Sequence, residues 1–504
     1  MVLSGDFLLL GAIGLASFLL LLVHLYYRHR FSYWRKRGVP CAASTFFFGS
    51  YKDCVLQKEC VGQFFQRMYN EGSGKPFFGI YVFNRPALVL RDPDVIKTIL
   101  VKEFNTFYER HASSNVRTDP LSQNLFLLKG AAWRALRVKL TPIFTSFRMK
   151  QMFSLISDCA DQLREYIEKN CTTGKPMEMK DVAAKYATDV ITSCAFGIKS
   201  NCLLDPNAEF REFGRQIFNF SVFRSFEFMS AFMLPLVTKL MNTKFFSSET
   251  TKFLRKAFWD TMKEREEKNI QRDDILQLLI QLKNEDAKAH KLKGDLLVAQ
   301  AAIFFTAGFE SSASTTSFTL CELALQPHLQ SRLRQEVLDV MERNQGKLPY
   351  EDIRDMEYLN MVVLETLRKF PVLPILDRVA GRDFVIPGTN VTIQKGTTVY
   401  IPLLGLHMDP DVFPDPDHYD PERFNEENRK ARHPFMYLPF GEGPKYCIGK
   451  GFGLISVKTA LANIIANFEV STCAETPKRL QLNPKAMILA SIAGLYLKFT
   501  KLKH

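Results

Sequence analysis

The ten residues 440–449 read FGEGPKYCIG, a glycine-rich turn built around one cysteine. Glycines let backbone N–H groups approach the sulfur of Cys447, and a helix predicted from residue 450 adds the positive end of its dipole. Both effects favour a thiolate, and Phe440 can pack beside it and exclude water. A buried structural cysteine is the alternative. The pattern F-x-x-G-x-x-x-C-x-G is so rare by chance that we favour a protected thiolate.

A glutamate and an arginine precede this turn. Glu365 and Arg368 are three residues apart on a predicted helix, so both lie on one face and can form a charge-assisted pair. A chain of this length contains such a pair by chance, so alone it carries no weight. Arg423 follows just ahead of the cysteine turn. We expect a buried Glu–Arg–Arg cluster that locks the turn to the helix.

A carboxylate and a hydroxyl stand side by side in the helix predicted over 292–324. Glu310 and Ser311 lie in AGFESS, residues 307–312, within an otherwise apolar segment, and Gly308 permits a local widening of the helix. In one interpretation the serine bonds back to a carbonyl and the glutamate is solvated. In the other, Glu310 reaches water and Ser311 donates into an apolar pocket, forming a proton relay. Both interpretations stay open.

An aromatic ring and a cation are one helical turn apart at Trp133 and Arg137. Alone, this pair is typical of an amphipathic surface helix. Together with the three features above, in this order and at these separations, it resembles the cytochrome P450 family of haem-thiolate monooxygenases over essentially the whole chain. TDPLSQNLFLLKGAAW, AGFESSAS and FGEGPKYCIG are similar to family six, the insect detoxification branch of the microsomal enzymes.

The resemblance implies a fold and three parts of the chain. The fold is mainly α with small β-sheets, a single large haem-thiolate monooxygenase domain preceded by an N-terminal transmembrane helix. Residues 1–27 are the anchor, 28–45 a basic, proline-containing hinge and 46–504 the haem-binding catalytic domain.

The resemblance also implies residue roles. Cys447 is the thiolate ligand of the iron of haem b, whose electron push favours O–O cleavage. Four side chains hold the haem propionates: Trp133, Arg137, Arg378 and Lys445. Lys445 stands where the family usually has arginine and replaces a planar fork with a point charge. Glu310 and Ser311 are the catalytic acid–alcohol pair that delivers protons to dioxygen, with serine in place of the usual threonine. Glu365, Arg368 and Arg423 are structural.

Residues 7–27 form a run of 21 residues without formal charge. A helix of this length spans about 30 Å, the thickness of a bilayer core. A signal peptide is the alternative, but no positive region precedes the run and no small-residue cleavage site follows it. Five cations come directly after it, at 28, 30, 35, 36 and 37, and basic flanks stay cytosolic. We expect a single-pass protein of the endoplasmic reticulum membrane whose catalytic domain faces the cytosol.

The composition bounds the partners. The 504 residues are 46% hydrophobic and 24% charged, which excludes disordered and collagenous classes. The net charge of +13 suits nucleic acid, an anionic membrane or an acidic protein, but no nucleic-acid or nucleotide-binding motif is recognisable. We therefore expect a lipid membrane, an NADPH-dependent flavoprotein reductase and cytochrome b5 as partners, with no nucleic acid. Cations expected near the reductase are Lys139, Lys445, Lys450 and Lys458. The ten cysteines lack any CxxC pair and read as reduced thiols.

Hydrophobic periodicity predicts the main elements. Helices are expected over 149–169, 250–268, 274–284, 292–324, 328–344, 357–369 and 450–468. β-structure is expected over 77–90, over 372–402 and after 468. Candidate pocket residues, of which we expect about one in three to face the cavity and the rest to belong to the core, are Phe107, Phe126, Phe213, Phe218, Phe220, Phe223, Phe304, Leu373, Ile375 and Met487.

The function that follows is insertion of one oxygen atom from O₂ into lipophilic small molecules, such as xenobiotics, insecticides, plant toxins or endogenous lipids and terpenoids. Two alternatives stay open. Haem-thiolate isomerases and dehydratases use neither O₂ nor a reductase and would not need Glu310 and Ser311. A non-catalytic haem or ligand-binding protein is the other.

Overall fold

The apolar periodicity predicts the long helices well. The computed structural model describes residues 3–218, 221–285 and 292–503. The predicted helices are present as α6 (Ser146–Cys171), α11 (Ser248–Lys268), α12 (Ile275–Glu285), α13 (Asp295–Leu325), α14 (Pro327–Arg343), α16 (Glu357–Lys369) and α19 (Lys450–Asn467). The other helices are α1 (Leu3–Arg30), α2 (Lys52–Val55), α3 (Val61–Glu71), α4 (Pro93–Lys97), α5 (Gly130–Leu140), α7 (Met179–Ala195), α8 (Glu209–Ile217), α9 (Val222–Met233), α10 (Pro235–Met241), α15 (Tyr350–Asp355), α17 (Leu403–His407) and α18 (Glu426–Ala431).

Single tight turns connect several of these helices. The 3₁₀ turns are η1 (Arg35–Arg37), η3 (Pro120–Ser122), η4 (Thr141–Phe144), η5 (Pro421–Phe424) and η6 (Pro434–Met436), and η2 (Thr98–Lys102) is a π turn. The mainly α fold with small sheets confirms the predicted fold class.

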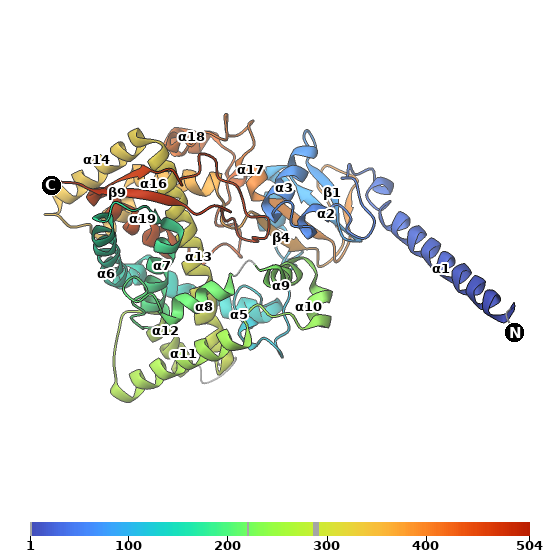
Figure 1. The fold of residues 1–504 in the computed structure, drawn as a ribbon, viewed down its shortest axis with the longest axis horizontal. Helices are drawn as coiled ribbons and strands as arrows, with labels where there is room; N and C mark the ends of the chain where they lie inside the picture. Colours follow the sequence, from blue (N-terminus) through green and yellow to red (C-terminus); the bar gives the residue numbers. More distant parts are fainter. Residues whose placement is uncertain (1–2, 219–220, 286–291, 504) are drawn as a thin grey trace.

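Helix α13 crosses the middle of the domain (Figure 1). It is apolar on nearly all sides and buried on nearly all sides, as such a helix must be. Helix α7 packs along it. At their contact, a Cβ on Gly308 would lie 3.0 Å from Cδ1 of Ile191. Gly308 therefore serves close helix packing, and α13 remains α-helical throughout, so the predicted local widening is wrong.

Three small sheets complete the domain. The largest has the order β1-β2-β7-β4, with β1 (Phe77–Val82), β2 (Arg85–Leu90), β4 (Ile375–Val379) and β7 (Thr398–Pro402). β2 runs parallel to β7, and the other neighbours are antiparallel. The second joins β3 (Met177–Glu178), β9 (Tyr496–Lys501) and β8 (Phe468–Thr472), and the third pairs β5 (Phe384–Val385) with β6 (Thr392–Ile393). The register Arg378↔Val399 fixes β4, which carries one of the predicted site residues.

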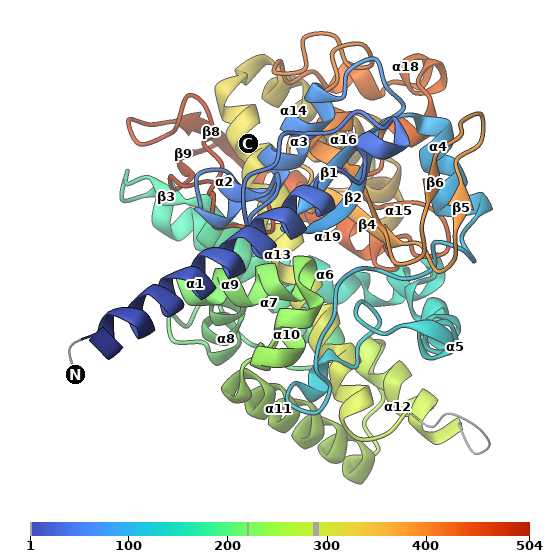
Figure 2. The same cartoon turned by 90° about the vertical axis from the view of Figure 1, so that its right-hand side faces the viewer.

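Helix α1 projects from the domain on the side opposite the C-terminus (Figure 1). Its apolar part is 0% buried, whereas α13, which is also long and apolar enough to cross a membrane, is 78% buried. Burial identifies α13 as a core helix. Figure 2 shows β1 and β2 beside the base of α1. There Arg30 Nε donates to the Asn84 carbonyl (3.2 Å), and the buried Trp34 donates through Nε1 to the Ile80 carbonyl (3.1 Å).

Candidate functional site

A cavity of about 310 Å³ lies between α5, α13, β4 and the 440–449 turn. Every predicted site residue lines it: Trp133, Arg137, Glu310, Ser311, Arg378, Phe440, Lys445 and Cys447. These residues come from four separate segments of the chain, and the fold brings them together around one cavity.

Cys447 lines this cavity, and its side chain is exposed within it. Its amide donates to the Phe440 carbonyl (2.8 Å), and α19 begins three residues later, with Gly449 as its N-cap. Burial raises the pKa of the Cys447 thiol, while the Gly449 N–H and the neighbouring cations Arg137 and Arg110 act in the opposite direction. The Gly449 N–H is the contribution that the glycine-rich pattern predicts, and the effect of burial on the pKa outweighs it.

The turn needs glycine for close approach. Gly443 has φ +74°, and a Cβ there would meet the Leu100 carbonyl oxygen of η2 at 2.1 Å. No other residue fits that contact without moving the backbone.

Three cations that line the cavity each have a buried nitrogen without a hydrogen-bond partner among the described residues. The atoms are Nη2 of Arg137, Nε of Arg378 and Nζ of Lys445. Burial, reinforced by Arg110, lowers the pKa of Arg378 to about 10 and that of Lys445 to about 7. Buried cations are normally paired, so this cluster lacks its negative partner.

Aromatic rings supply part of the compensation for Lys445. Its Nζ lies 4.3 Å from the Trp133 ring centroid and 5.1 Å from that of Tyr108. The Arg137 guanidinium lies 4.6 Å from the Tyr446 ring centroid. These contacts hold the two cationic groups in place, but ring faces do not neutralise their charges.

Arg110 is a fourth cation in the site, and the sequence did not predict it. It donates to the carbonyls of Phe126 (3.0 Å) and Lys445 (3.3 Å), and burial lowers its pKa. It stands outside any of the four motifs, in FYERHA. The one available signal was its position between Phe107 and Phe126, two candidate pocket residues.

The residues present fit a haem. Its two carboxylates are the anions that a cluster of unpaired buried arginine and lysine nitrogens lacks. The sulfur of Cys447 opens into the same cavity as these nitrogens, and a thiolate is the iron ligand of this class of haem.

Glu310 and Ser311 do not match either sequence interpretation completely. Ser311 Oγ donates back to the Ala307 carbonyl (2.6 Å), as the first interpretation expects. Glu310, however, is buried and paired with Lys180 of α7, whose Nζ lies 2.7 Å from Glu310 Oε1 and 2.7 Å from Ser314 Oγ. The Lys180 side chain is 28% exposed and the Glu310 side chain 9%. Lys180 thus stands between the carboxylate and solvent, and no sequence pattern indicates this pairing.

The rest of the cavity is apolar and rich in phenylalanine. Of the predicted pocket residues, Phe126, Phe218, Phe304, Leu373 and Met487 line it, and Phe228, Phe232 and Phe245 join them unpredicted. Four candidates do not line the cavity. Phe107 and Ile375 lie in the core, Phe213 stacks on Phe253 (4.2 Å) and Phe223 is exposed. Phe220 lies outside the described residues.

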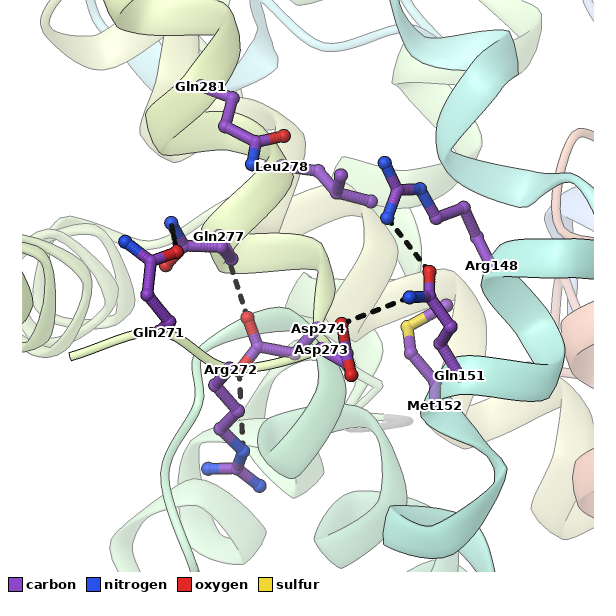
Figure 3. A pocket seen from close by; sticks show the side chains of 10 residues that line it. All are labelled: Arg148, Gln151, Met152, Gln271, Arg272, Asp273, Asp274, Gln277, Leu278 and Gln281. Atoms are coloured by element: carbon purple, nitrogen blue, oxygen red, sulfur yellow. Dashed lines mark hydrogen bonds and ion pairs between the residues drawn. The ribbon is translucent and has the colours of Figure 1, made fainter.

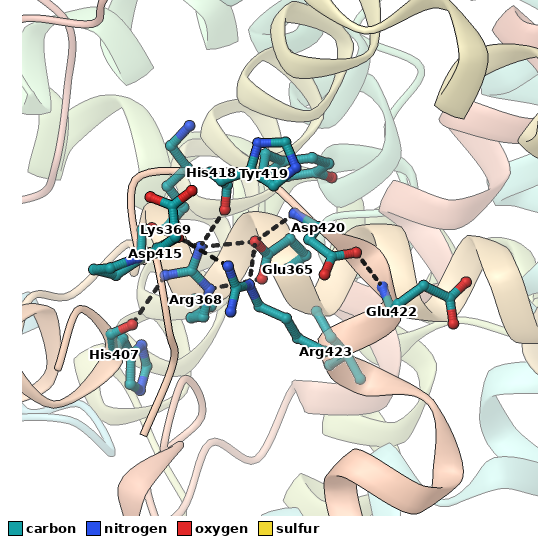
Figure 4. A network of polar contacts seen from close by, with 12 residues as sticks. Glu365, Arg368, Lys369, His407, Asp415, His418, Tyr419, Asp420, Glu422 and Arg423 are labelled. Carbon is teal, nitrogen blue, oxygen red and sulfur yellow. Dashed lines mark hydrogen bonds and ion pairs between the residues drawn. The ribbon is translucent and has the colours of Figure 1, made fainter. Parts of the chain in front are cut away.

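Glu365, Arg368 and Arg423 form the expected buried cluster (Figure 4). Arg368 is fully buried and makes a bidentate pair with Glu365, with both N–O distances 2.7 Å. Arg423 Nε lies 3.7 Å from Glu365 Oε1. The cluster lies outside the lining of the cavity, which fits a structural role.

Two of the cations expected near a reductase are buried instead. Lys445 faces the cavity, and Lys458 donates to the Arg354 carbonyl (2.9 Å) while burial lowers its pKa to about 8. Lys450 is exposed and Lys139 partly so.

A second, smaller depression lies between α6 and the α11–α12 connection (Figure 3). Its polar side chains are bonded to one another, as in the Gln151 to Asp273 contact (3.2 Å), and Asp274 pairs with the buried Arg265 (Nη1–Oδ1 2.8 Å). Because the polar side chains of this depression bind one another, the Cys447 cavity is the better candidate for the site.

Known proteins agree with this geometry. The cytochrome P450 family model matches residues 40–499. The chain is 50% identical to "Cytochrome P450 6k1" of Blattella germanica, over 98% of this chain and 97% of that protein. It is 40% identical to "Probable cytochrome P450 6g2" of Drosophila melanogaster, over 94% and 95%. These insect relatives confirm the resemblance to family six, and with the cysteine turn, the buried cations and the mainly α fold they show that the chain belongs to the cytochrome P450 family of haem-thiolate monooxygenases.

Proposed function

We propose that the protein is a membrane-anchored monooxygenase of lipophilic small molecules that carries haem b and receives electrons from NADPH through a flavoprotein reductase, with cytochrome b5 as a further donor. The observation that carries this proposal is a single cavity in which Cys447, unpaired buried cations and a phenylalanine-rich chamber meet. The cations suit the cofactor and the rings suit an apolar substrate.

Each residue has a proposed task. Cys447 ligates the iron, and Arg110, Arg137, Arg378 and Lys445 neutralise the propionates, with Trp133 beside them. Phe440 excludes water from the sulfur. Bound here, the thiolate-ligated haem supplies reductive activation of O₂ and transfer of one oxygen atom to substrate.

Proton supply falls to Glu310 and Ser311. Lys180 holds the carboxylate within 2.7 Å at the edge of α13, where one side faces solvent and the other lines the cavity. We propose that protons enter along Lys180 and Glu310, and that Ser311 passes them on when its hydroxyl turns away from the Ala307 carbonyl.

The anchor and location belong to the same proposal. Residues 1–27 are the membrane anchor, 28–45 the basic connection and 46–504 the catalytic domain, facing the cytosol from the endoplasmic reticulum. The exposed apolar surface of α1 and the exposed cations Arg28, Arg35 and Lys36 support this arrangement.

The test is NADPH consumption by the purified holoprotein with a purified reductase and a lipophilic test substrate, with oxidised product measured alongside. A monooxygenase consumes NADPH and O₂ and forms an oxygenated product. Turnover of substrate without NADPH would instead identify an isomerase or dehydratase. Binding without any turnover would identify a ligand-binding protein.

A further inference from the structure

His407 connects the Glu365–Arg368 pair to the segment that leads into the cysteine turn. It is the last residue of α17 and is fully buried. Its carbonyl accepts a hydrogen bond from Arg368 Nη1 (3.0 Å), a contact that Figure 4 shows. Its ring nitrogen Nε2 accepts the backbone N–H of Leu438 (3.0 Å). One residue therefore binds both the charge cluster and the start of the turn.

The connection continues to Cys447 through backbone bonds. The Gly441 N–H donates to the Leu438 carbonyl (2.9 Å), and the Cys447 N–H donates to the Phe440 carbonyl (2.8 Å). A contiguous series of hydrogen bonds and adjacent residues thus runs from α16 to the amide of the cysteine. Within it, the His407 ring makes the bond that joins α17 to the 438–447 segment.

The surroundings keep this ring neutral. Burial and the adjacent Arg368 guanidinium lower the pKa of His407 to about 3. Because a backbone N–H can only donate, Nε2 is the unprotonated acceptor of a neutral ring. The ring packs on Tyr437, with centroids 5.0 Å apart, and the Tyr437 hydroxyl donates to the Leu364 carbonyl (2.6 Å). Both neighbours attach the ring to α16.

We propose that His407 is a positioning residue for the thiolate: by accepting the Leu438 N–H, it fixes the turn that carries the Cys447 sulfur to the Glu365–Arg368 pair. The inference rests on the proposed role of Cys447 as iron ligand. The Glu365–Arg368 pair does not itself line the cavity. In this proposal, His407 connects the pair to the turn that carries Cys447. Outer residues of this kind orient metal ligands and affect metal affinity when they are lost.

The test compares His407→Phe, which keeps a ring but removes the acceptor, with His407→Gln, whose Oε1 can accept the same N–H. The matched control is His433→Phe. His433 Nδ1 also accepts a backbone N–H, from Phe435 (3.2 Å), in the neighbouring η6 turn, but it has no bond to Arg368. Each holoprotein is reduced and exposed to carbon monoxide, and its Soret band is recorded beside circular dichroism and haem content.

We expect His407→Phe to lose most of the red-shifted band of thiolate ligation while the helical signal remains. His407→Gln should keep most of that band, and His433→Phe should match the wild type. A full band in folded His407→Phe would overturn the inference, because a merely structural residue would lower the unfolding midpoint and leave the ligation unchanged.

Misfolding of a variant and an error in the proposed ligand can each be distinguished from an error in the role of His407. If His407→Phe does not fold, His407→Asn, whose shorter amide cannot reach the Leu438 N–H, replaces it, and equal bands in the Asn and Gln variants overturn the inference. If the wild-type protein itself lacks the red-shifted band, the proposed ligand is wrong. A normal wild-type band with unaffected His407 variants contradicts only the role of His407.

Discussion

Lys445 is a buried ammonium group that the chain stabilises with ring faces instead of a carboxylate. It is 5% exposed, and Trp133 and Tyr108 are its neighbours. Leaving a charge so poorly compensated is costly unless a ligand supplies the opposite charge. At the residue scale, buried cations without a carboxylate partner therefore mark the site as clearly as the other residues that line the cavity.

Two replacements of Lys445 distinguish the effect of its positive charge from the effect of its shape. Lys445→Arg should retain haem as well as the wild type or better, because the guanidinium fork can bond a carboxylate twice. Lys445→Met should release haem faster, on the order of tenfold, as for other lost supporting contacts. The measurement is the rate of haem transfer to an excess of apomyoglobin. Equal rates for Met and wild type would show that Lys445 does not contact the cofactor.

Lys180 tests the proposed path of protons. Lys180→Met removes the cation that holds Glu310, so product per NADPH should fall and peroxide should rise, on the order of tenfold, less than the 10²-fold or more expected from losing the carboxylate itself. Lys185→Met is the matched control, because Lys185 lies on the same helix but pairs with Asp181 (3.0 Å). Equal coupling in both variants would contradict the path.

At the element scale, a buried carboxylate holds in place a segment that lines the cavity. Asp119, next to η3, accepts the N–H groups of Phe245 (2.8 Å) and Phe246 (3.2 Å), and Phe245 lines the cavity. This bond pair attaches the α10–α11 connection to the segment before α5. Phenylalanine periodicity could not reveal it, because an aspartate in a loop carries no periodic signal.

The Asp119 bonds predict a pH dependence. Burial raises the pKa of Asp119 from 3.8 to about 6, so the folded protein binds more protons than the unfolded chain between these values. Stability from this group is greatest below about pH 4 and is lost as pH rises through about 6. Asp119→Asn keeps an acceptor and should raise the free energy of unfolding at pH 7–8 by about 1–2 kcal/mol, with little change at pH 4. Urea unfolding across pH 4–8 checks this, and parallel curves for the two proteins would contradict it.

The elements also show where sequence prediction succeeds. Amphipathic and apolar periods predicted α6, α11, α13 and α19, because a single face or a whole helix is buried there. Helix α7 was missed because MKDVAAKYATDVITSCA mixes small, polar and β-branched residues, yet most of it is buried against α13. Lys180 lies on that helix, so the same mixture concealed a site residue.

Prediction of the site residues from the sequence has a comparable limit. The resemblance that the motifs carry implied one shared site for Cys447, Trp133, Arg137 and Glu310, and the structure places them in one cavity. Contacts between distant segments, such as Lys180 with Glu310 or His407 with Leu438, depend on tertiary packing, and no local pattern encodes them. The same limit explains why Phe107 and Phe213 were assigned to the cavity although they pack elsewhere.

At the scale of the whole molecule, α1 extends beyond the domain, and the connection that follows it packs on the domain through the buried Trp34. Arg30, at the end of α1, is bonded to Asn84 between β1 and β2, and Trp34 is bonded to β1, so removal of residues 1–27 leaves both bonds in place. The domain match to the P450 family likewise starts at residue 40.

Deletion of residues 1–27 should therefore preserve the haem domain and weaken membrane association without abolishing it. The exposed cations at 28–37 should retain part of the binding to anionic vesicles, about 1 kcal/mol per cation near the surface, and this part should fall with salt. Flotation at low and high salt measures both contributions. Undiminished flotation of the truncated protein at high salt would contradict a single anchor.

The central claim is that Cys447 ligates a haem iron in this cavity, and the carbon monoxide spectrum of the reduced protein tests it most directly. The wild-type protein should show the red-shifted Soret band of thiolate ligation, and Cys447→Ala should abolish it. Cys473→Ala, which removes another partly exposed free thiol, should leave the band unchanged. Persistence of the red-shifted band in Cys447→Ala would contradict the account.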